Sequence, residues 1–179
     1  MRSLRLAAMA LACFTSGLLV QTVLGQGGKP VFNAEQMKTL DAKKAASTML
    51  ETALQLAENG SWERIAVGRA YYLGGDKARG QQIFDMVTAN NKAESSDWFR
   101  MGRVYAEAHE WDKAKTAFDK ALSMKPNDDS GMIEYGGLAN IQGERAKAEE
   151  LFAKAIAKNS KEFWHWVNAG GSYLGVIPQ

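Results

Sequence analysis

The chain is poor in the residues that build reactive or cross-linked sites. It contains one cysteine, two histidines and three prolines among 179 residues. Cys13 lies in a segment that we expect to be removed, so the remaining chain can form neither a disulfide nor a thiolate metal site. His109 and His165 have no companion at metal-ligand spacing. These absences exclude a thiol nucleophile in the mature chain, and we predict no metal and no cofactor.

The chain also lacks a marked excess of charge of either sign. It has 22 basic and 20 acidic residues, and loss of Arg2 and Arg5 with the N-terminal segment leaves the two signs balanced. Nucleic-acid binding needs a basic face or stripe, so we do not expect a nucleic acid as partner. With 46% hydrophobic and 23% charged residues, the composition excludes a disordered tail, a collagen-like fibre and a multi-span membrane protein.

Patterns typical of catalytic or ion-binding loops are missing as well. Residues 74–77 are glycine-rich but lack the preceding strand and the Ser or Thr of a phosphate-binding loop. Residues 127–130 lack the twelve-residue calcium pattern and suit the start of a helix. No set of Ser, His and Asp stands out by order or spacing. We therefore predict that the protein is not an enzyme.

Residues 1–25 have the pattern of a targeting segment. A basic start at residues 1–5 is followed by a mostly apolar stretch at 6–20 and then by small or light side chains at 23–25, where a signal peptidase needs them. That order predicts a cleaved secretory signal peptide, and hence a periplasmic or secreted protein without a membrane span in its mature form. Two alternatives stay open. One is a retained anchor, although the stretch barely reaches the ~20 residues that a span needs, and the other is a lipoprotein signal at Cys13.

The strongest feature of the sequence is that equivalent residues recur every 34 positions, a spacing that we call the repeat period. Side chains recur in three columns, which are Gly68, Gly102, Gly136 and Gly170, then Tyr71, Tyr105, Ala139 and Tyr173, then Phe84, Phe118 and Phe152. Each unit has two apolar helical stripes with a break between them, as in the helices predicted over 95–108 and 111–124. Two helices approach closely only where side chains are small. The glycine column therefore allows close contact, and we expect Phe118 to fill the space between helices of neighbouring units.

The second unit resembles the tetratricopeptide repeat family, whose units are about 34 residues long. The residues that carry the resemblance are Trp98, Met101, Gly102, Tyr105, Ala114, Phe118 and Pro126. It extends over residues 61–174, with Gly80 in place of an alanine and with Lys92 and Ser160 where a proline would stop the helix. The resemblance implies an all-α fold, a right-handed superhelix of antiparallel helix pairs with about three full repeats and partial terminal helices.

The same register divides the whole chain. The expected parts are the signal peptide at 1–25, a flexible linker at 26–33, an N-terminal cap or degenerate repeat at 34–60, repeats at 61–94, 95–128 and 129–162, and a C-terminal half-repeat at 163–179. The linker follows from three glycines and one proline within residues 25–30. The cap contains a helix predicted over 43–58.

The resemblance implies a protein–protein interaction module, a scaffold that we expect in the cell envelope. In the family, the first helices line a concave face that binds a peptide or helix of a partner. The residues that we expect on this face are Ile65, Arg69, Tyr72, Phe99, Arg103, Ile133, Asn140, Trp164 and Val167. The partner is a protein or peptide of unknown identity.

This face combines an apolar column with a column that changes character along the chain. Successive members of the apolar column Ile65, Phe99, Ile133 and Val167 are one repeat period apart, and one helical turn further on lie Arg69, Arg103, Gly137 and Gly171. The pattern predicts an apolar strip, two guanidinium groups that can each hold a carboxylate, and open room at the two glycines. The alternative is that the apolar column packs between first helices and that the arginines are solvated.

The C-terminal helix predicts a second interaction surface. It opens with the aromatic residues of 163–166, and Val176 and Ile177 follow it. A terminal repeat normally has a polar outer face, so an exposed apolar patch here indicates self-association and a homo-oligomer. The alternative is that the tail folds back over the patch. We expect Trp98 and Trp166 in the packed core of their units.

Overall fold

A computed structural model describes residues 38–89 and 92–179. The predicted signal peptide, the linker and the start of the N-terminal cap lie outside them. The helices are α2 (Ala42–Leu56), α3 (Ser61–Leu73), α4 (Lys77–Thr88), α5 (Ser95–Glu107), α6 (Trp111–Met124), α7 (Asp129–Ile141), α8 (Arg145–Lys158) and α9 (Phe163–Ser172). No strand occurs in this part of the chain. The all-α prediction is confirmed.

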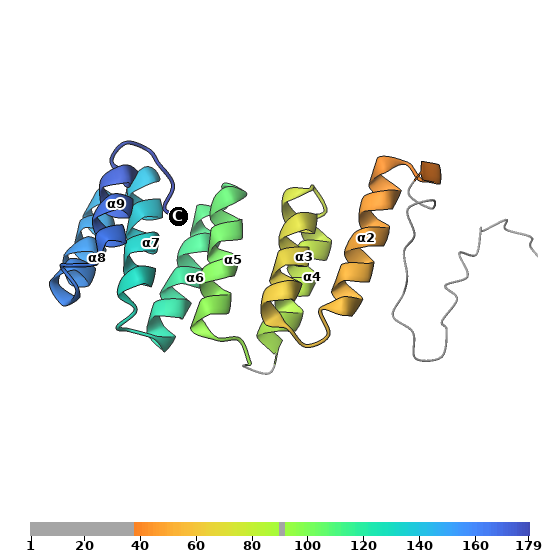
Figure 1. The fold of residues 1–179 in the computed structure, drawn as a ribbon, viewed down its shortest axis with the longest axis horizontal. Helices are drawn as coiled ribbons and strands as arrows, with labels where there is room; N and C mark the ends of the chain where they lie inside the picture. Colours follow the sequence, from red (N-terminus) through yellow and green to blue (C-terminus); the bar gives the residue numbers. More distant parts are fainter. Residues whose placement is uncertain (1–37, 90–91) are drawn as a thin grey trace, which may run out of the picture. The chain divides into compact units, whose positions relative to one another are not determined.

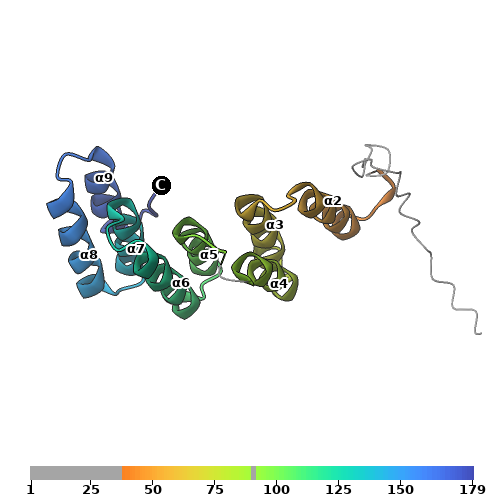
Figure 2. The ribbon, with the colours of Figure 1, turned by 90° about the horizontal axis from the view of Figure 1, so that it is seen from below.

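The helices pack as antiparallel pairs, each joined by a short turn (Figure 1). The pairs are α3 with α4, α5 with α6 and α7 with α8, while α3 also contacts α5 and α7 contacts α9. Figure 2 shows α3, α5 and α7 along one side and α4 and α6 along the other. The helices expected over 95–108, 111–124 and 43–58 end within two residues of α5, α6 and α2.

The turn inside each pair has the same geometry. Gly75, His109 and Gly143 follow one another at the repeat period, and their φ angles are +101°, +59° and +86°. The next N–H in each turn donates to a carbonyl five residues earlier, as Glu110 does to Tyr105 at 2.8 Å. This is a common way to end a helix, and it favours glycine because the left-handed conformation crowds a Cβ. His109 adopts it without being glycine.

The glycine and phenylalanine columns meet inside each pair. A Cβ placed on Gly102 would lie 2.5 Å from the Phe118 ring, and a Cβ on Gly136 would lie 2.7 Å from Phe152. Gly68 and Phe84 form the equivalent contact. The Phe118 ring is fully buried and also packs across to the next pair, where it lies 5.0 Å from the ring of Tyr135. The expectation that phenylalanine joins neighbouring units is confirmed, with an additional contact inside its own pair.

Gly170, in α9, is the last member of the glycine column among the described residues, and no phenylalanine lies against it there. A Cβ on Gly170 would meet nothing within 4 Å. Trp166 is 54% exposed and donates its indole N–H to the carbonyl of Ser160 at 2.9 Å. The prediction that Trp166 is a core residue is therefore wrong, because no helix of the described residues covers its ring. Trp98, which has such a helix, packs against the core.

At the other end, α2 covers the first pair. Leu50, Ala53 and Leu54 pack against a small core of Val67, Tyr71 and Ile83. Glu51 in α2 also accepts hydrogen bonds from Arg79 in α4, with an ion-pair distance of 2.8 Å. The helix predicted in the N-terminal cap thus contacts both helices of the first pair.

Candidate partner-binding face

The first helix of each pair contributes to one surface, formed by α3, α5, α7 and α9, which we call the first-helix face. The structure sorts the nine residues predicted there into three groups. The first group is buried and consists of Ile65, Tyr72, Phe99 and Ile133. The second group forms hydrogen bonds at the surface and consists of Arg69, Arg103 and Asn140. The third group is exposed and consists of Trp164 and Val167. Each group differs in a separate respect from the partner-binding surface that the sequence predicts.

The apolar column is part of the core over most of its length. Ile65, Phe99 and Ile133 are at most 5% exposed. The Phe99 ring lies against Gly131 of α7, so close that a Cβ at that glycine would overlap it. The expectation of an exposed apolar strip is corrected at these three positions, because the column packs between successive first helices. Val167 alone in the column is exposed, at 41%, because no first helix of the described residues packs on the outer side of α9.

Tyr72 is also buried, and its hydroxyl takes part in a polar cluster at the turn between α5 and α6. It donates to Glu110 at 2.5 Å. Lys77 and Lys113 lie 2.5 and 2.6 Å from the two oxygens of the same carboxylate. The hydrogen bonds from Lys113, Lys77 and Tyr72 together lower the pKa of Glu110 to about 2. The cluster fixes the second pair to the first.

An equivalent contact recurs one unit later. Glu144, one repeat period after Glu110, accepts from the indole N–H of Trp111 and from Lys115, both at 2.8 Å. The hydrogen bond from Lys115, followed by that from Trp111, lowers the pKa of Glu144. Trp111 in turn lies one repeat period after Lys77. In both of these turns, the carboxylate therefore binds the second helix of the preceding pair.

We expect Glu110→Gln to remove an acid-dependent part of the stability. The folded-state pKa of Glu110 lies below the ordinary value, so the unfolded chain binds the extra proton and wild-type stability falls as the pH drops from about 4.5 toward 2. Because the two lysines are half exposed, solvent screening limits the loss at pH 7 to about 1 kcal/mol.

Urea unfolding at pH 7, 4 and 3 measures this effect. The variant starts lower at pH 7 and loses less on acidification. The control is Glu150→Gln, whose carboxylate pairs with Lys154 within one helix at the surface. The hydrogen bond from Lys154 also lowers the pKa of Glu150, but solvent screens this pair, so the pH dependence should change much less than in Glu110→Gln. A Glu110 variant that follows the wild-type curve at all three pH values would contradict the assignment.

Both arginines of the first-helix face already hold a carboxylate of the chain. Arg69 in α3 donates from Nε to Glu107 of α5 at 3.0 Å. Arg103 in α5 donates from two nitrogens to the two oxygens of Glu134 in α7, and this hydrogen bonding raises the pKa of Arg103. The side chains of Arg69 and Arg103 are 52% and 48% exposed. Exposed pairs contribute only about 0–1 kcal/mol. Glu107 is 40% exposed and Glu134 only 17%, so an acidic partner group can compete more readily for Arg69 than for Arg103.

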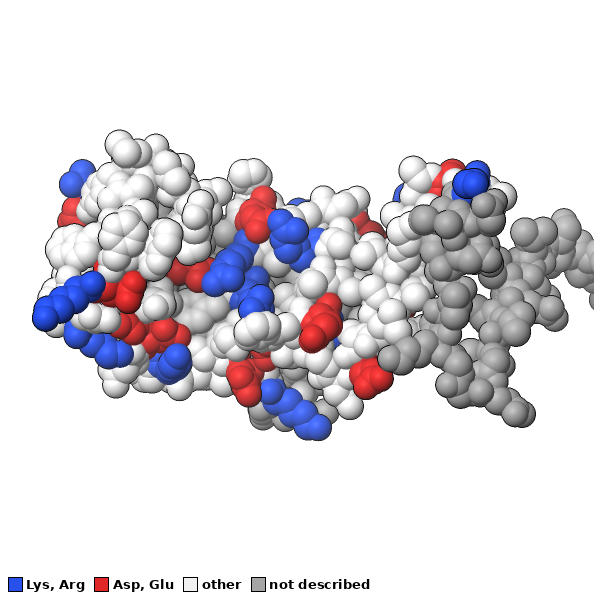
Figure 3. All heavy atoms as spheres, in the orientation of Figure 1, with Lys and Arg blue, Asp and Glu red and all other residues white. Residues whose placement is uncertain are grey.

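The first-helix face has a charged part and a part with few charges. Figure 3 shows charged side chains gathered over α3 and α5, whereas few lie over α9 and the end of the chain. The change follows the sequence column in which Arg69 and Arg103 give way to Gly137 and Gly171. We call the surface around these two glycines the glycine groove.

The chain's own tail lies in the glycine groove. A Cβ on Gly137 would come within 2.5 Å of Pro178, and one on Gly171 within 3.6 Å of Val176. The carboxamide of Asn168 pairs with the backbone of Gln179, donating to its oxygen at 3.4 Å and accepting from its N–H at 3.3 Å. The tail folds back, but into the glycine groove and not over the aromatic patch that the alternative expected it to cover.

The tail nevertheless leaves the apolar patch of the last helix open. Val176 and Ile177 are 55% and 63% exposed. Phe163 and Trp164 pack edge to face with ring centres 5.3 Å apart, and both stay more than half exposed. Asn140, expected to contact a partner, donates to the hydroxyl of Ser172 at 3.0 Å and so joins α7 to α9.

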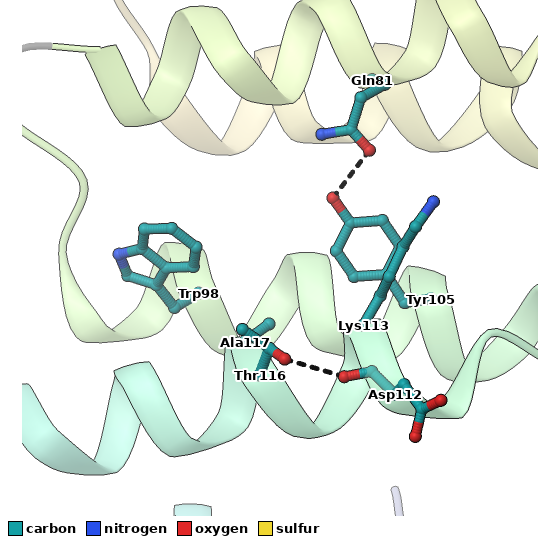
Figure 4. A pocket seen from close by; sticks show the side chains of 7 residues that line it. All are labelled: Gln81, Trp98, Tyr105, Asp112, Lys113, Thr116 and Ala117. Carbon is teal, nitrogen blue, oxygen red and sulfur yellow. Dashed lines mark hydrogen bonds between the residues drawn. The ribbon is translucent and has the colours of Figure 1, made fainter.

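A second concavity lies between the second helices α4 and α6. It has a volume of about 570 Å³ and is lined by Gln81, Trp98, Tyr105, Asp112, Lys113, Thr116 and Ala117 (Figure 4). The Tyr105 hydroxyl donates to Gln81 at 3.0 Å across it, and burial raises the pKa of that phenol. The lining has no pair of groups in hydrogen-bond contact that would make a nucleophile and its base.

Residues 38–89 and 92–179 offer neither a metal-binding cluster nor a membrane-spanning helix. No group of three or more His, Cys, Asp or Glu side chains lies close enough together to hold a metal ion. Among the helices described, none combines the length and apolar character needed to cross a membrane.

Sequence reasoning missed the polar partners of the first-helix face. It assigned no role to Glu107, Glu134 or Asn168, and it did not connect Glu110 with Glu144. The last two are one repeat period apart, so a search for acidic columns would have found them. Glu107 and Glu134 lie 38 and 31 residues from the arginines that they bind, and no periodic signal marks them.

Comparison with known proteins supports the repeat assignment for one unit. Residues 95–128 match the Tetratricopeptide repeat family. Among curated proteins, the chain is 24% identical over 112 residues to the human "Protein O-mannosyl-transferase TMTC1". That alignment covers 60% of this chain and 13% of the human protein, so the chain spans only a small part of that relative. No solved structure matches the chain at a significant level.

Proposed function

We propose that the chain is a protein–protein interaction module whose first-helix face binds an extended peptide or a helix of a partner protein. Tetratricopeptide repeats generally mediate protein–protein interaction, and residues 95–128 match that family. The observation that carries the proposal is the tail in the glycine groove, where extended polypeptide already lies against Asn168 and Gly137 of this face. The charged part, with Arg69 and Arg103, adds a preference for acidic groups next to that segment.

We also propose that the module works in the cell envelope as a scaffold without catalytic activity. The basic, apolar and small-residue order of residues 1–25 supports export. The tetratricopeptide fold typically serves as a non-catalytic scaffold. The mannosyl transfer in the name of the human relative is not carried over, because the alignment covers 13% of that protein. Fractionation of the source cell, with the N-terminus of the mature chain determined by mass spectrometry, tests the export.

Site-specific photo-crosslinking tests partner binding in the exporting cell. A crosslinking amino acid replaces Arg69 or Val167 on the first-helix face, and Lys120 or Lys154 on second helices as matched exposed controls. We expect discrete adducts with a partner from the first two positions and none from the controls. Adducts that form equally from all four positions, or from the controls alone, would refute the proposed face.

Acidic groups of the partner should depend on the charged part of the face. Arg103→Ala breaks the contact with Glu134 and removes one guanidinium group. We expect the affinity for a captured acidic partner peptide to fall by up to about fivefold, because an exposed guanidinium–carboxylate contact contributes about 0–1 kcal/mol. Lys120→Ala is the control. Unchanged affinity of Arg69→Ala and Arg103→Ala for every acidic ligand would remove the arginines from the site.

Self-association through the last helix is the second candidate function. Phe163, Trp164 and Trp166 are 65%, 53% and 54% exposed on one helix, and an apolar patch of this kind commonly marks an interface. Light scattering should show a mass that rises with concentration and that falls to the monomer value in Trp164→Ser. Trp62→Ser is the matched control, since Trp62 is 52% exposed at the other end of the stack. A monomer at all concentrations would refute this candidate.

A further inference from the structure

The tail reaches the glycine groove through a sharp reversal after α9. Gly175 has a φ of +78°, a conformation that glycine adopts without strain. The N–H groups of Leu174 and Val176 both donate to the carbonyl of Gly171, at 2.9 and 3.0 Å. Residues 176–179 then run back, and Figures 1 and 2 both place the end of the chain beside α7.

The tail engages the groove with alternate residues. Val176 faces Gly171 and Pro178 faces Gly137, while Ile177 between them is 63% exposed. In an extended chain, residues two apart point to the same side. Gly137 supplies the space for Pro178, because a Cβ there would collide with the proline ring, whereas a Cβ at Gly171 would only touch Val176 at 3.6 Å.

Asn168 adds a contact that depends only on the main chain. Its carboxamide donates to the oxygen of Gln179 at 3.4 Å and accepts from the N–H of the same residue at 3.3 Å. Any amino acid other than proline offers that donor and acceptor. Both distances are at the long end for hydrogen bonds, and no residue of 176–179 is fully buried. The groove therefore holds the tail loosely.

We propose that residues 176–179 are a displaceable occupant of the glycine groove. The partner that displaces them is an extended, uncharged segment with a small branched residue and a proline two positions later. The inference rests on the proposed function and refines it, because it names the chemistry of the partner segment and a self-blocking contact. An uncharged segment fits because Gly137, Gly171 and Asn168 offer no charge to pair with, and Figure 3 shows few charged side chains over this area.

A labelled copy of the tail tests the proposal on the full chain. The probe is a fluorescein-labelled Leu-Gly-Val-Ile-Pro-Gln peptide, and fluorescence anisotropy reports its binding. In Pro178→Asp the charged side chain cannot occupy the space over Gly137, so the tail should leave the groove and the probe should bind at least tenfold more tightly than to the wild type. Ile177→Asp is the matched control, because Ile177 points away from the groove, and it should bind the probe as the wild type does.

A second pair of variants locates the probe. In the Pro178→Asp background, Gly137→Ala places a Cβ where the proline of the probe must lie, and it should weaken probe binding about tenfold. Gly170→Ala in the same background should have no effect, because a Cβ there meets nothing within 4 Å. Asn168→Ala should also weaken binding. Far-UV circular dichroism of each variant verifies that the helices are retained.

Three outcomes would overturn the proposal. One is equal probe affinity in the wild type, Pro178→Asp and Ile177→Asp, and another is no binding by a fully helical Pro178→Asp. The third is a wild-type dimer that Pro178→Asp converts to a monomer, because the tail would then occupy the groove of a second copy. If crosslinking from Arg69 still captures a partner in any of these cases, the proposed function stands and only the role of the tail fails.

Discussion

Gly102→Leu should destabilise the fold by about 3 kcal/mol or more, whereas Gly170→Leu should leave it unchanged or slightly more stable. A Cβ on Gly102 would lie 2.5, 2.7 and 3.0 Å from three atoms of the Phe118 ring. That ring cannot move away, because Phe99, Trp111 and Tyr135 surround it with ring centres 5.0 to 6.4 Å distant. Overpacking of a filled core typically costs about 1–3 kcal/mol, occasionally more, and leucine adds four carbons here.

Gly170 is the matched control because it belongs to the same sequence column and lies inside a helix as well. Nothing approaches its Cβ position, so leucine there gains up to about 0.8 kcal/mol of helix propensity with no collision. Urea unfolding followed by far-UV circular dichroism gives both free energies. Equal effects at the two positions would show that the glycine column does not act through contact with phenylalanine.

The pairing of helices could be predicted because it depends on side-chain volume at a fixed period. Glycine at 68, 102 and 136 and phenylalanine sixteen residues later meet in the same way in three pairs. The contact is local to one unit, and the turn between the helices is short, so sequence spacing translates directly into spatial contact. Gly170 retains the period but lacks the phenylalanine, and there the prediction of packing fails, as at Trp166.

The exposure of the apolar column could not be predicted from its period. The constant spacing indicates that Ile65, Phe99 and Ile133 occupy equivalent positions, but not how closely successive first helices approach. That distance depends on a contact between units, in which Phe99 lies against Gly131. A bulky residue opposite a glycine brings the column into the core, and the polar residues of the same helices are left at the surface.

The polar partners needed three-dimensional information for a different reason. Arg69 binds Glu107 and Arg103 binds Glu134, so the two arginines reach different positions of the following helix. A long arginine side chain binds the nearest carboxylate, whether or not that carboxylate lies at the equivalent position of the next unit. The open room at Gly137 and Gly171 was predictable from the lack of side chains, but the tail that fills it depends on the reversal at Gly175.

Because each pair contacts only its neighbours, the same core substitution should have unequal effects along the stack. Phe118→Ala should lower the free energy of unfolding by about 3–5 kcal/mol, since the ring is fully buried and packs against three other rings. Phe152→Ala should cost less, about 3 kcal/mol, at the lower end of the same range. Phe152 is 5% exposed, and its one close aromatic neighbour is Tyr173, at 6.2 Å.

Hydrogen exchange distinguishes the two variants by where protection is lost. Phe118 joins the second pair to the third through Tyr135, so Phe118→Ala should speed exchange in α5, α6 and α7. Phe152→Ala should act on α7, α8 and α9 and leave α3 and α4 protected. Phe163→Ala, at a position 65% exposed, serves as the surface control and should change stability by less than about 0.5 kcal/mol. A loss of protection that spreads evenly over all helices in both core variants would contradict nearest-neighbour coupling, because the stack would then unfold as one indivisible unit.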